Sequence, residues 1–451
     1  MALFNDKSIH QITGMLAQKK ISAVEIAQES IKQYTALEQK VQAWVCFNGD
    51  KLLSEAKAAD ARLSDGQPVR SLEAVPIGVK DIMNTIDFPT QMGSPIWKDF
   101  TPGNDARVVF SLKQEGGLVP GKTVTAEFAV HTLGKTLNPH DVTRTPGTSS
   151  SGSAVAVATA MVPAALATQT AGSIVRPASF CGIYGCKPSF GLIPRTGLLK
   201  TTDSLDTVGF MAYHYEDLKN LFEVFRVHGH NYPVSDTYLS DTSLQSAPSG
   251  RPWKIAFVRT RTWKNLPDQE AKSIEEWIAR LSREKDIEIH EVELPAIMQK
   301  SHEVHATIYD KTLAYYFNEE FKKAELVSPI MNRLIAHGNK ITVSEYQAAL
   351  NTQEEMWRAM DGFLDGFDVM VSHATAGPAP LRDTEELPDP ALMWTMTHLP
   401  VVHVPLFRSS DGLPFGMQIT AKKYLDYKLL TFCDMLIQRE IIPTHAQGVR
   451  L

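Results

Sequence analysis

Strand-like and helix-like segments alternate along this chain, and the alternation constrains its fold more than any other sequence feature. The apolar runs "AVPIGVK" and "MVPAALATQT" are typical of buried strands, whereas "ARVVFSLKQE" and "SGSAVAVATA" have the pattern of helices. The same alternation returns further along with "KIAFV" and "IEIHEVELP". A chain of this kind buries its apolar faces by layering helices on a sheet, so we predict an α/β fold.

The organisation favours one continuous domain over residues 1–451. The sequence shows no internal repeat. Residues 228–252 are polar and rich in turn formers, and we predict that they form an exposed connection. Residues 300–366 are mostly helical in pattern, which adds a helical elaboration to the sheet.

Composition and charge narrow the classes of function. The 45 basic and 51 acidic residues are spread along the chain without a basic stripe, so we expect no nucleic-acid partner. The longest apolar run, residues 154–167, is shorter than the roughly 20 residues that cross a bilayer. The N-terminus lacks the pattern of a secretory signal, and four cysteines without metal-type spacing suit reduced thiols, so we predict a cytoplasmic protein.

Two short motifs suggest functions that their surroundings do not support. The run "GGLVPGKT" fits the phosphate-binding pattern, but that loop needs a strand before it and a helix starting at the lysine. Here a helix-like segment precedes the motif and a strand-like one follows, so we do not predict nucleotide binding. His302 and His305 in "SHEVH" lack the spacing that places two zinc ligands on one helical face, and we predict no metal site.

A lysine, a serine cluster and a small-residue turn remain as the candidate chemistry. Lys80 ends a strand-like run, "TSSSGS" occupies residues 148–153, and "TAGS" occupies residues 170–173. Serine clusters are usually loops, because small hydroxyls bind the local backbone. This cluster is followed by an apolar helix-like run, which a simple linker does not require.

With these motifs the sequence resembles the amidase signature family, hydrolases built on a Lys, cis-Ser, Ser triad. The resemblance rests on "VPIGVKD", "MGSPIWKDFTPGNDARVV", "GKTVTAEFA", "NPHDVTRTPGTSSSGSAVAVA", "QTAGSIVRPASFCGIYGCKP" and "DGLPFGMQI", which occur in the family's order. It implies a single large mixed β-sheet covered by helices on both faces. The resemblance is weak over residues 212–365, which we expect to form a variable, partly helical insertion that shapes the acyl pocket.

The resemblance assigns different tasks to the serines. It implies that Ser173 is the nucleophile, Ser149 the bridging serine, after a cis peptide bond, and Lys80 the general base. Ser150 would support the lysine by hydrogen bonding, and Ser151 and Ser153 would be loop and helix-start residues. The chemistry is consistent, because a serine is a weak nucleophile until a base removes its proton. A lysine serves as that base only when it is neutral, and burial lowers its pKa toward that state.

The turn of residues 170–173 is the expected oxyanion hole, in which the backbone N–H groups of Thr170, Ala171, Gly172 and Ser173 bind the developing charge. The sequence departs from the family pattern at three places. Thr148 and Ala171 replace common glycines, and Gln169 replaces a frequent aspartate.

Three further residues are predicted to bind substrate. The resemblance suggests Met92 and Gly93 in "QMGSP" and Arg176 in "SIVRPA". Arg176 resembles the arginine that holds a substrate carboxylate in the malonamidase branch, and its planar donors suit that task. The alternative is a structural arginine paired with loop carboxylates or carbonyls.

We therefore expect an amidohydrolase that cleaves a linear carbon–nitrogen bond through a seryl acyl-enzyme, acting on a small amide that bears a carboxylate. No metal or organic cofactor is required. The alternatives are the glutaminase component of a tRNA-dependent amidotransferase and a non-catalytic scaffold. The expected partner is the small amide, with a homodimer as the alternative to a monomer.

Overall fold

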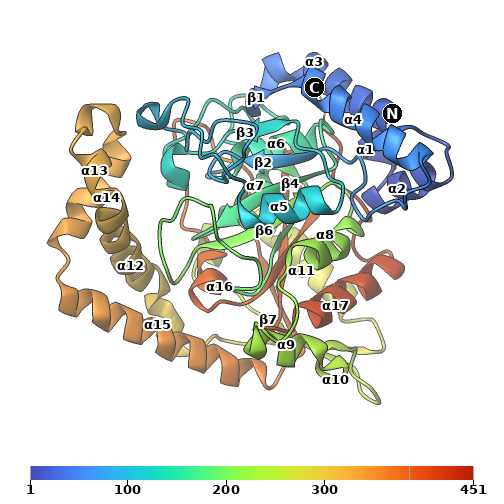
Figure 1. Cartoon of the computed structure of the whole chain (residues 1–451). Helices are drawn as coiled ribbons and strands as arrows, with labels where there is room; N and C mark the ends of the chain where they lie inside the picture. The colour runs from blue at the N-terminus through green and yellow to red at the C-terminus, as the bar shows by residue number, and fades with distance from the viewer. Residues whose placement is uncertain (1, 385, 450–451) are drawn as a thin grey trace.

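A mixed β-sheet runs through the whole protein (Figure 1). The computed structural model describes residues 2–384 and 386–449. Within them, one sheet has its strands in the order β1-β3-β2-β4-β6-β5-β10-β11-β9-β7-β8. The strands are β1 (Trp44–Phe47), β2 (Ile77–Lys80), β3 (Gly121–Thr123), β4 (Ala164–Gln169), β5 (Tyr184–Lys187), β6 (Thr207–Ala212), β7 (Trp253–Phe257), β8 (Ile287–Glu291), β9 (Val369–His373), β10 (Val401–Arg408) and β11 (Pro414–Thr420).

Parallel and antiparallel strand pairs occupy different parts of the sheet. Strand β2 is parallel to both β3 and β4, and β7 is parallel to β8 and β9. Between these groups, the ladder from β4 through β6, β5, β10 and β11 to β9 is antiparallel. The predicted α/β class with a single large mixed sheet is confirmed.

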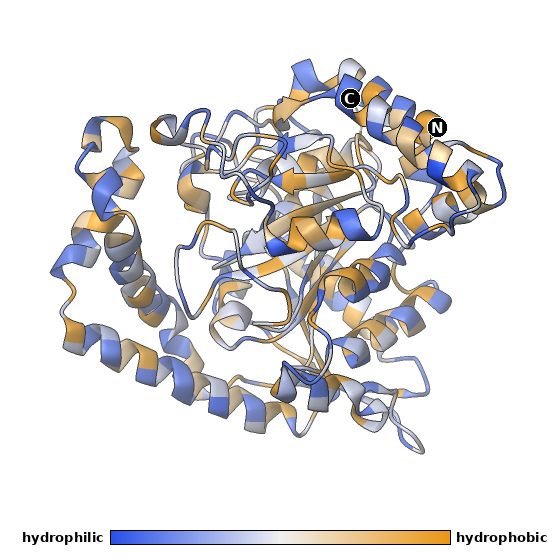
Figure 2. Cartoon of the chain, in the orientation of Figure 1, coloured by the Kyte–Doolittle hydropathy of each residue, from blue (hydrophilic) through white to orange (hydrophobic). Residues whose placement is uncertain are grey.

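Helices cover both faces of the sheet, as predicted. The main helices are α2 (Ile9–Ala17), α3 (Ala23–Val41), α4 (Gly49–Ser64), α5 (Arg107–Gln114), α6 (Ser151–Ala158), α7 (Val175–Cys181), α8 (Asp217–Phe225), α11 (Asp268–Leu281), α16 (Leu392–Met396) and α17 (Asp426–Gln438), with the short α1 (Leu3–Asp6). Side chains alternate along each strand: Leu166 packs into the core that includes α5, α8 and α17, whereas Ala165 and Ala167 pack with α6 on the opposite face. Figure 2 shows hydrophobic and hydrophilic residues alternating along the helices that cover the sheet.

The elements around the serine motifs meet at one edge of the layered core. Val79 of β2 pairs with Leu166 of β4, so the carboxyl ends of these parallel strands lie side by side. Lys80 is the last residue of β2, and Thr168 lies near the end of β4. Helix α6 begins at Ser151, and α7 begins two residues after Ser173. Strand pairing therefore brings the lysine, the serine cluster and the small-residue turn together.

A helical arm extends from the sheet, on the left and lower side of Figure 1. It consists of α12 (Ser301–Tyr316), α13 (Asn318–Phe321), α14 (Pro329–Lys340) and α15 (Val343–Leu364). Helix α12 packs against α14, α15 and α16. The segment 212–365 also supplies β7 and β8, so part of it belongs to the central sheet and the arm is its helical part.

Residues 228–252 are mostly exposed, as predicted, but the segment is partly helical instead of a series of turns. The segment contains α9 (Pro233–Ser240) and α10 (Thr242–Gln245). Pro233 occupies the first turn of α9, and the Asp241 side chain caps α10. Proline, aspartate and serine favour helix starts as well as turns, which explains the difference. Gln245 anchors the segment by hydrogen bonds with the backbone of Tyr424 and Tyr427.

The "GGLVPGKT" motif follows a helix and runs into a strand, which is the reverse of the order in a phosphate-binding loop. Helix α5 precedes it, and its lysine, Lys122, lies in β3. The Lys122 ammonium is buried 3.2 Å from the Asp81 carboxylate. This ion pair also shows that Asp81 turns away from its neighbour Lys80. None of the described helices combines the length and the apolar character needed to cross a lipid bilayer.

Candidate active site

Lys80 is the centre of the candidate site. Its side chain is fully buried, and Nζ lies 2.8 Å from Ser149 Oγ, 2.9 Å from Ser150 Oγ and 2.9 Å from Thr168 Oγ1. Three hydroxyls and no carboxylate contact the amine. A charged ammonium is poorly compensated in such a setting, because hydroxyl groups carry only partial charges.

The hydrogen-bond directions suit a neutral amine, which has two N–H donors and one lone pair. Ser150 Oγ donates to the carbonyl oxygen of Thr168 at 3.2 Å, so it accepts from Lys80. If Thr168 Oγ1 accepts the second N–H, the lone pair is left for the hydroxyl proton of Ser149. This is the direction in which a proton must move when lysine acts as a base.

Burial lowers the pKa of Lys80 well below its usual value. The nearby Asp206 carboxylate acts against this by raising the pKa, whereas the Arg176 guanidinium lowers it further. Desolvation dominates because it penalises only the charged form of the lysine. Burial therefore gives Lys80 the lowered pKa that a lysine needs in order to act as a general base.

Ser149 contacts Lys80 directly, and Ser173 lies in the turn that follows β4, the strand that pairs with β2. The peptide bond between Thr148 and Ser149 is cis, as the resemblance implies and despite the threonine. Ser173 is 6% exposed, and its hydroxyl makes no hydrogen bond with a described residue. The structure thus shows the contact between Lys80 and Ser149 but no hydrogen bond between Ser149 and Ser173. Catalytic hydrogen bonds often tighten only when substrate is bound.

The turn between β4 and α7 leaves backbone donors unused. Among the described residues, the N–H groups of Thr170, Ala171, Gly172 and Ser173 donate to no acceptor, which suits the predicted oxyanion hole. Ala171 is not among the residues with positive φ, so its methyl group is accommodated. Gly172 cannot be replaced by a residue with a side chain without a shift of its surroundings, because a Cβ there would lie 1.7 Å from the Asp389 carboxylate.

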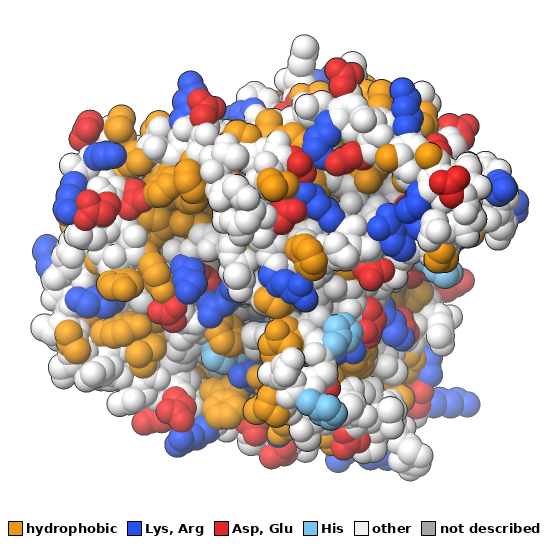
Figure 3. All heavy atoms as spheres, in the orientation of Figure 1, with side chains coloured by type: hydrophobic (Ala, Val, Ile, Leu, Met, Phe, Trp, Pro, Cys, Tyr) orange, Lys and Arg blue, Asp and Glu red, His pale blue; other side chains and the backbone are white. Residues whose placement is uncertain are grey.

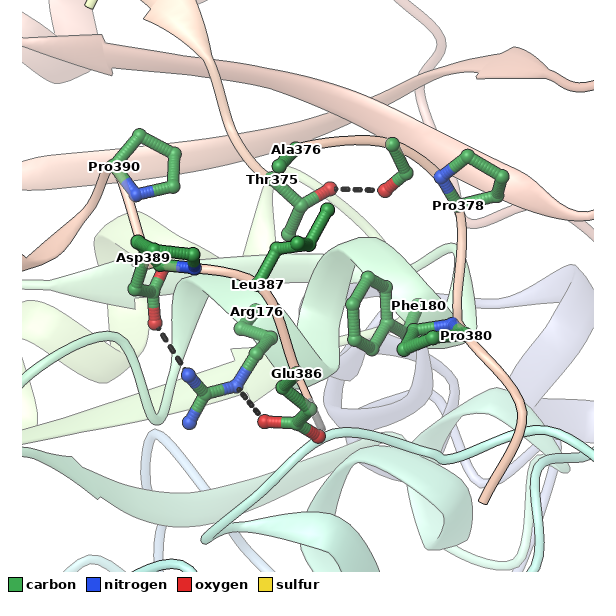
Figure 4. A pocket seen from close by; sticks show the side chains of 12 residues that line it. Arg176, Phe180, Thr375, Ala376, Pro378, Pro380, Glu386, Leu387, Asp389 and Pro390 are labelled. Atoms are coloured by element: carbon green, nitrogen blue, oxygen red, sulfur yellow. Dashed lines mark hydrogen bonds and ion pairs between the residues drawn. The ribbon is translucent and has the colours of Figure 1, made fainter. Parts of the chain in front are cut away.

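Arg176 is held by two acidic side chains, which Figure 4 shows, and by a backbone carbonyl group. Its guanidinium lies 2.6 Å from Asp389 and 2.9 Å from Glu386, and it donates to the Thr148 carbonyl oxygen at 2.7 Å. Burial opposes the charge of Arg176, but Glu386 and Asp389 raise its pKa. The adjoining cavity, of about 40 Å³, has room for only about three water molecules. These contacts favour the structural alternative for Arg176.

Met92 and Gly93 form a tight loop between Asp81 and Phe128, since the N–H of Met92 donates to the Asp81 carbonyl oxygen and the N–H of Phe128 donates to the Met92 carbonyl oxygen. Met92 has φ 58° and packs in an apolar cluster with Phe128, Tyr309 and Phe317. A Cβ on Gly93 would lie 3.0 Å from the Ala126 carbonyl oxygen, and its φ is 67°. The loop thus links the sheet to the helical arm, and its contact with substrate stays a prediction.

His131 lies next to the helical arm. Burial lowers the pKa of His131 to about 4, although part of its side chain is accessible to water. Arg176 and Arg333 lower this pKa further, and Glu386 raises it. The ring of Tyr309 on α12 lies 6.3 Å from the ring of His131.

The amidase family profile matches residues 25–430, almost the whole chain. This protein belongs to the amidase family. Among curated amidase relatives, the A component of the glutamyl-tRNA(Gln) amidotransferase of Bdellovibrio bacteriovorus is 30% identical over 472 residues, covering 94% of this chain and 95% of the relative.

Solved structures of amidase-family members share the fold. The peptide amidase of Stenotrophomonas maltophilia superposes with a TM-score of 0.84 and 23% identity, covering 100% of this chain and 99% of that chain. The A component of the glutamyl-tRNA(Gln) amidotransferase of Thermotoga maritima superposes with a TM-score of 0.77 and 22% identity, covering 99% of each chain. At these identities the structures support the fold alone.

Several amidase-site residues were not found from the sequence. Thr168 contacts Lys80, and Glu386 and Asp389 hold Arg176. Gln169, noted only as a departure, accepts hydrogen bonds from the N–H groups of Ile174 and Val175 at the start of α7. The only available signal for the acidic pair was the run "EELPDP", with three carboxylates and two prolines, which does not reveal a partner far away in sequence.

The lowered pKa of Lys80 predicts the pH dependence of amide cleavage. Activity needs the deprotonated amine, so kcat/KM should rise with pH through an ionisation below the ordinary lysine pKa of about 10.4 and then level off. Because the Asp206 charge raises the pKa of Lys80, Asp206→Asn should move this ionisation to lower pH. The measurement is kcat/KM against pH for both proteins; a shift to higher pH would contradict the assignment.

Proposed function

We propose that this protein hydrolyses a carboxylic amide through a seryl acyl-enzyme, with Ser173 as nucleophile, Ser149 as proton relay and Lys80 as general base. The observation that carries the proposal is the buried Lys80 amine, 2.8 Å from Ser149 Oγ. Its lowered pKa provides the neutral base that a serine nucleophile needs.

The proton movements balance within this set of residues. Ser149 gives its proton to the Lys80 lone pair and takes the proton of Ser173, whose oxygen attacks the amide carbonyl carbon. The negative charge that forms on the carbonyl oxygen is stabilised by the N–H groups of Ala171, Gly172 and Ser173. When the carbon–nitrogen bond breaks, the proton returns through Ser149 to the leaving amine. Water then releases the acid by the same route.

The preferred substrate in this proposal is a small amide that bears a carboxylate. Arg176 was the first candidate for binding that carboxylate, but Glu386 and Asp389 already occupy its guanidinium. Arg333 on α14 is the better candidate. It is exposed, lies within 4 Å of no described carboxylate oxygen and makes no hydrogen bond with a described residue, and its charge lowers the pKa of both His131 and Asp310. In this proposal Arg176 instead organises Thr148 and Asp389 beside the turn.

The second candidate function is the glutaminase role of the A component of an amidotransferase. The 30% identity to the Bdellovibrio bacteriovorus relative over 94% of this chain supports it. Acidic and basic side chains are interspersed over the face shown in Figure 3, and the sequence has no basic stripe, which gives this candidate no electrostatic support for a tRNA partner. Ammonia release from small amides by the purified chain alone would favour the hydrolase.

The same proposal places the enzyme in the cytoplasm. All four cysteines, Cys46, Cys181, Cys186 and Cys433, are free thiols, and burial raises the pKa of the Cys181 thiol to levels at which it stays protonated. Free thiols persist in a reducing compartment. A protonated, buried Cys181 is also a poor competitor for the role of nucleophile.

The nucleophile assignment predicts a single site of covalent labelling. A fluorophosphonate should modify Ser173, and Ser173→Ala should remove both labelling and turnover. Ser149→Ala and Lys80→Ala should each reduce kcat/KM by several orders of magnitude, on the order of 10³-fold or more, because the relay is broken. Peptide mapping by mass spectrometry locates the label.

Ser151→Ala is the matched control for these serine variants. Ser151 lies in the same cluster, but its hydroxyl faces the Val124 carbonyl oxygen at 3.5 Å, so activity should stay within a few-fold of the wild type. A label on Ser149 or Cys181, or full activity of Ser173→Ala, would refute the proposed function.

The substrate preference predicts different effects for the two arginines. Arg333→Ala should lower the ratio of kcat/KM for a carboxylated amide to that for its neutral counterpart by about 10- to 100-fold, the value of one charged hydrogen bond. Arg176→Ala should reduce both substrates alike, since it disturbs the turn. Lys340→Ala, on the exposed end of α14, is the control. An unchanged ratio in Arg333→Ala would exclude the carboxylate role of Arg333.

A further inference from the structure

Three carbonyl groups of the catalytic turn, those of Thr170, Ala171 and Gly172, are each held by a donor. The Thr170 carbonyl oxygen lies 3.0 Å from His305 Nε2, and the Ala171 carbonyl oxygen lies 2.6 Å from Thr395 Oγ1. The Gly172 carbonyl oxygen accepts from the N–H of Arg176 at 2.8 Å. Three successive peptide groups are therefore fixed on one side.

Fixing a carbonyl also fixes the N–H of the next residue. In a trans peptide group the C=O and N–H bonds are coplanar and point in opposite directions. The N–H groups of Ala171, Gly172 and Ser173 belong to the three peptide groups whose carbonyls are held. They point away from the holding donors, and none donates to an acceptor among the described residues.

We propose that His305 and Thr395 are positioning residues for the oxyanion hole, a role that rests on the proposed acyl-enzyme function. They touch neither the reacting serine nor the expected substrate carbonyl. Their effect is to hold two peptide groups so that the N–H donors of Ala171 and Gly172 are oriented before the negative charge forms. Preorganised donors stabilise an oxyanion without reorganisation at the moment of reaction.

His305 brings the helical arm into this arrangement. It lies on α12, is 5% exposed, and packs against the ring of Tyr309 at 5.3 Å between ring centres. Burial lowers the pKa of His305 to about 4, with the Thr170 carbonyl acting in the opposite direction. The imidazole is therefore neutral near pH 7. Because a carbonyl only accepts, Nε2 carries the ring proton.

Thr395 connects the turn to the start of α7. Its hydroxyl accepts from Gln169 Nε2 at 3.0 Å and donates to the Ala171 carbonyl oxygen. The other end of the Gln169 amide accepts from the N–H of Ile174 and the N–H of Val175. The glutamine in place of aspartate thus supplies both an acceptor for the helix and a donor for the threonine, which a carboxylate cannot do.

Loss of a holding donor should affect the transition state more than the bound substrate. A released peptide group can rotate, and its N–H then no longer faces the oxyanion. The neutral carbonyl of the substrate depends less on these donors than the charged oxygen does. A fall in kcat with little change in KM distinguishes this role from a general loss of structure.

The first comparison uses His305→Leu and His305→Gln. The leucine variant removes the donor, and kcat should fall about 10- to 100-fold with KM nearly unchanged, somewhat less than the 10²–10³ typical of deleting an oxyanion donor itself. The glutamine variant keeps an N–H donor at a similar reach and should recover most of kcat. An aldehyde analogue of the best amide substrate should bind more weakly to the leucine variant by the same factor, whereas the acid product should bind equally.

The second comparison tests Thr395 with a neighbour as control. Thr395→Val removes the hydroxyl and should lower kcat in the same way, and Thr395→Ser should restore it. Thr397→Val is the matched control, because Thr397 is equally buried but its hydroxyl binds Met393 within its own helix. Thr397→Val should leave kcat and aldehyde affinity within about two-fold of the wild type.

The outcomes separate this inference from the function on which it rests. Wild-type protein is first labelled with a fluorophosphonate, and absence of label on Ser173 would overturn the proposed function and this inference together. With Ser173 labelled, unchanged kcat in both His305→Leu and Thr395→Val would overturn the positioning role alone. Equal losses of aldehyde and acid affinity would also overturn it. The Thr395 series decides the question if His305→Leu does not fold.

Discussion

The burial of one amine determines how the rest of the candidate site is built. Lys80 lies in the core with three hydroxyls around Nζ and no carboxylate in contact. A charged lysine in this position would lack a counter-ion, so the fold favours the neutral form. The neutral amine has a lone pair, and the lone pair gives Ser149 a basic partner. Proton transfer thus follows from desolvation rather than from a histidine.

The sheet register provides that environment. The parallel pairing of β2 with β4 places the ends of both strands at one level, so Lys80 and Thr168 meet without a long loop. Helix α6 packs on the same strands and presents Ser149 and Ser150 from its leading segment. The positive charge of Arg176 also lowers the pKa of Lys80, and Glu386 and Asp389 compensate that charge directly.

Much of this arrangement could be predicted from the sequence because it is encoded locally. The strand ending at Lys80, the helix start after the serine cluster and the small-residue turn all depend on residues close together in the chain. The partners Thr395 and His305 could not be predicted, because they reach the turn from 224 and 135 residues away. The spacing of the two histidines in "SHEVH" indicates only whether they could bind a metal. It does not indicate that His305 binds a backbone carbonyl group. The helices within residues 228–252 could not be predicted because the same residue types start helices and turns.

The protonation state of Lys80 tests this account most directly. Protein with 13C-labelled lysine can be followed by NMR as pH is varied, with Lys80→Met used to assign the resonance of the Lys80 side chain. The account predicts that the amine loses its proton at a titration midpoint well below the usual lysine value of about 10.4. A Lys80 resonance that stays in the charged form up to about pH 10 would contradict the central claim.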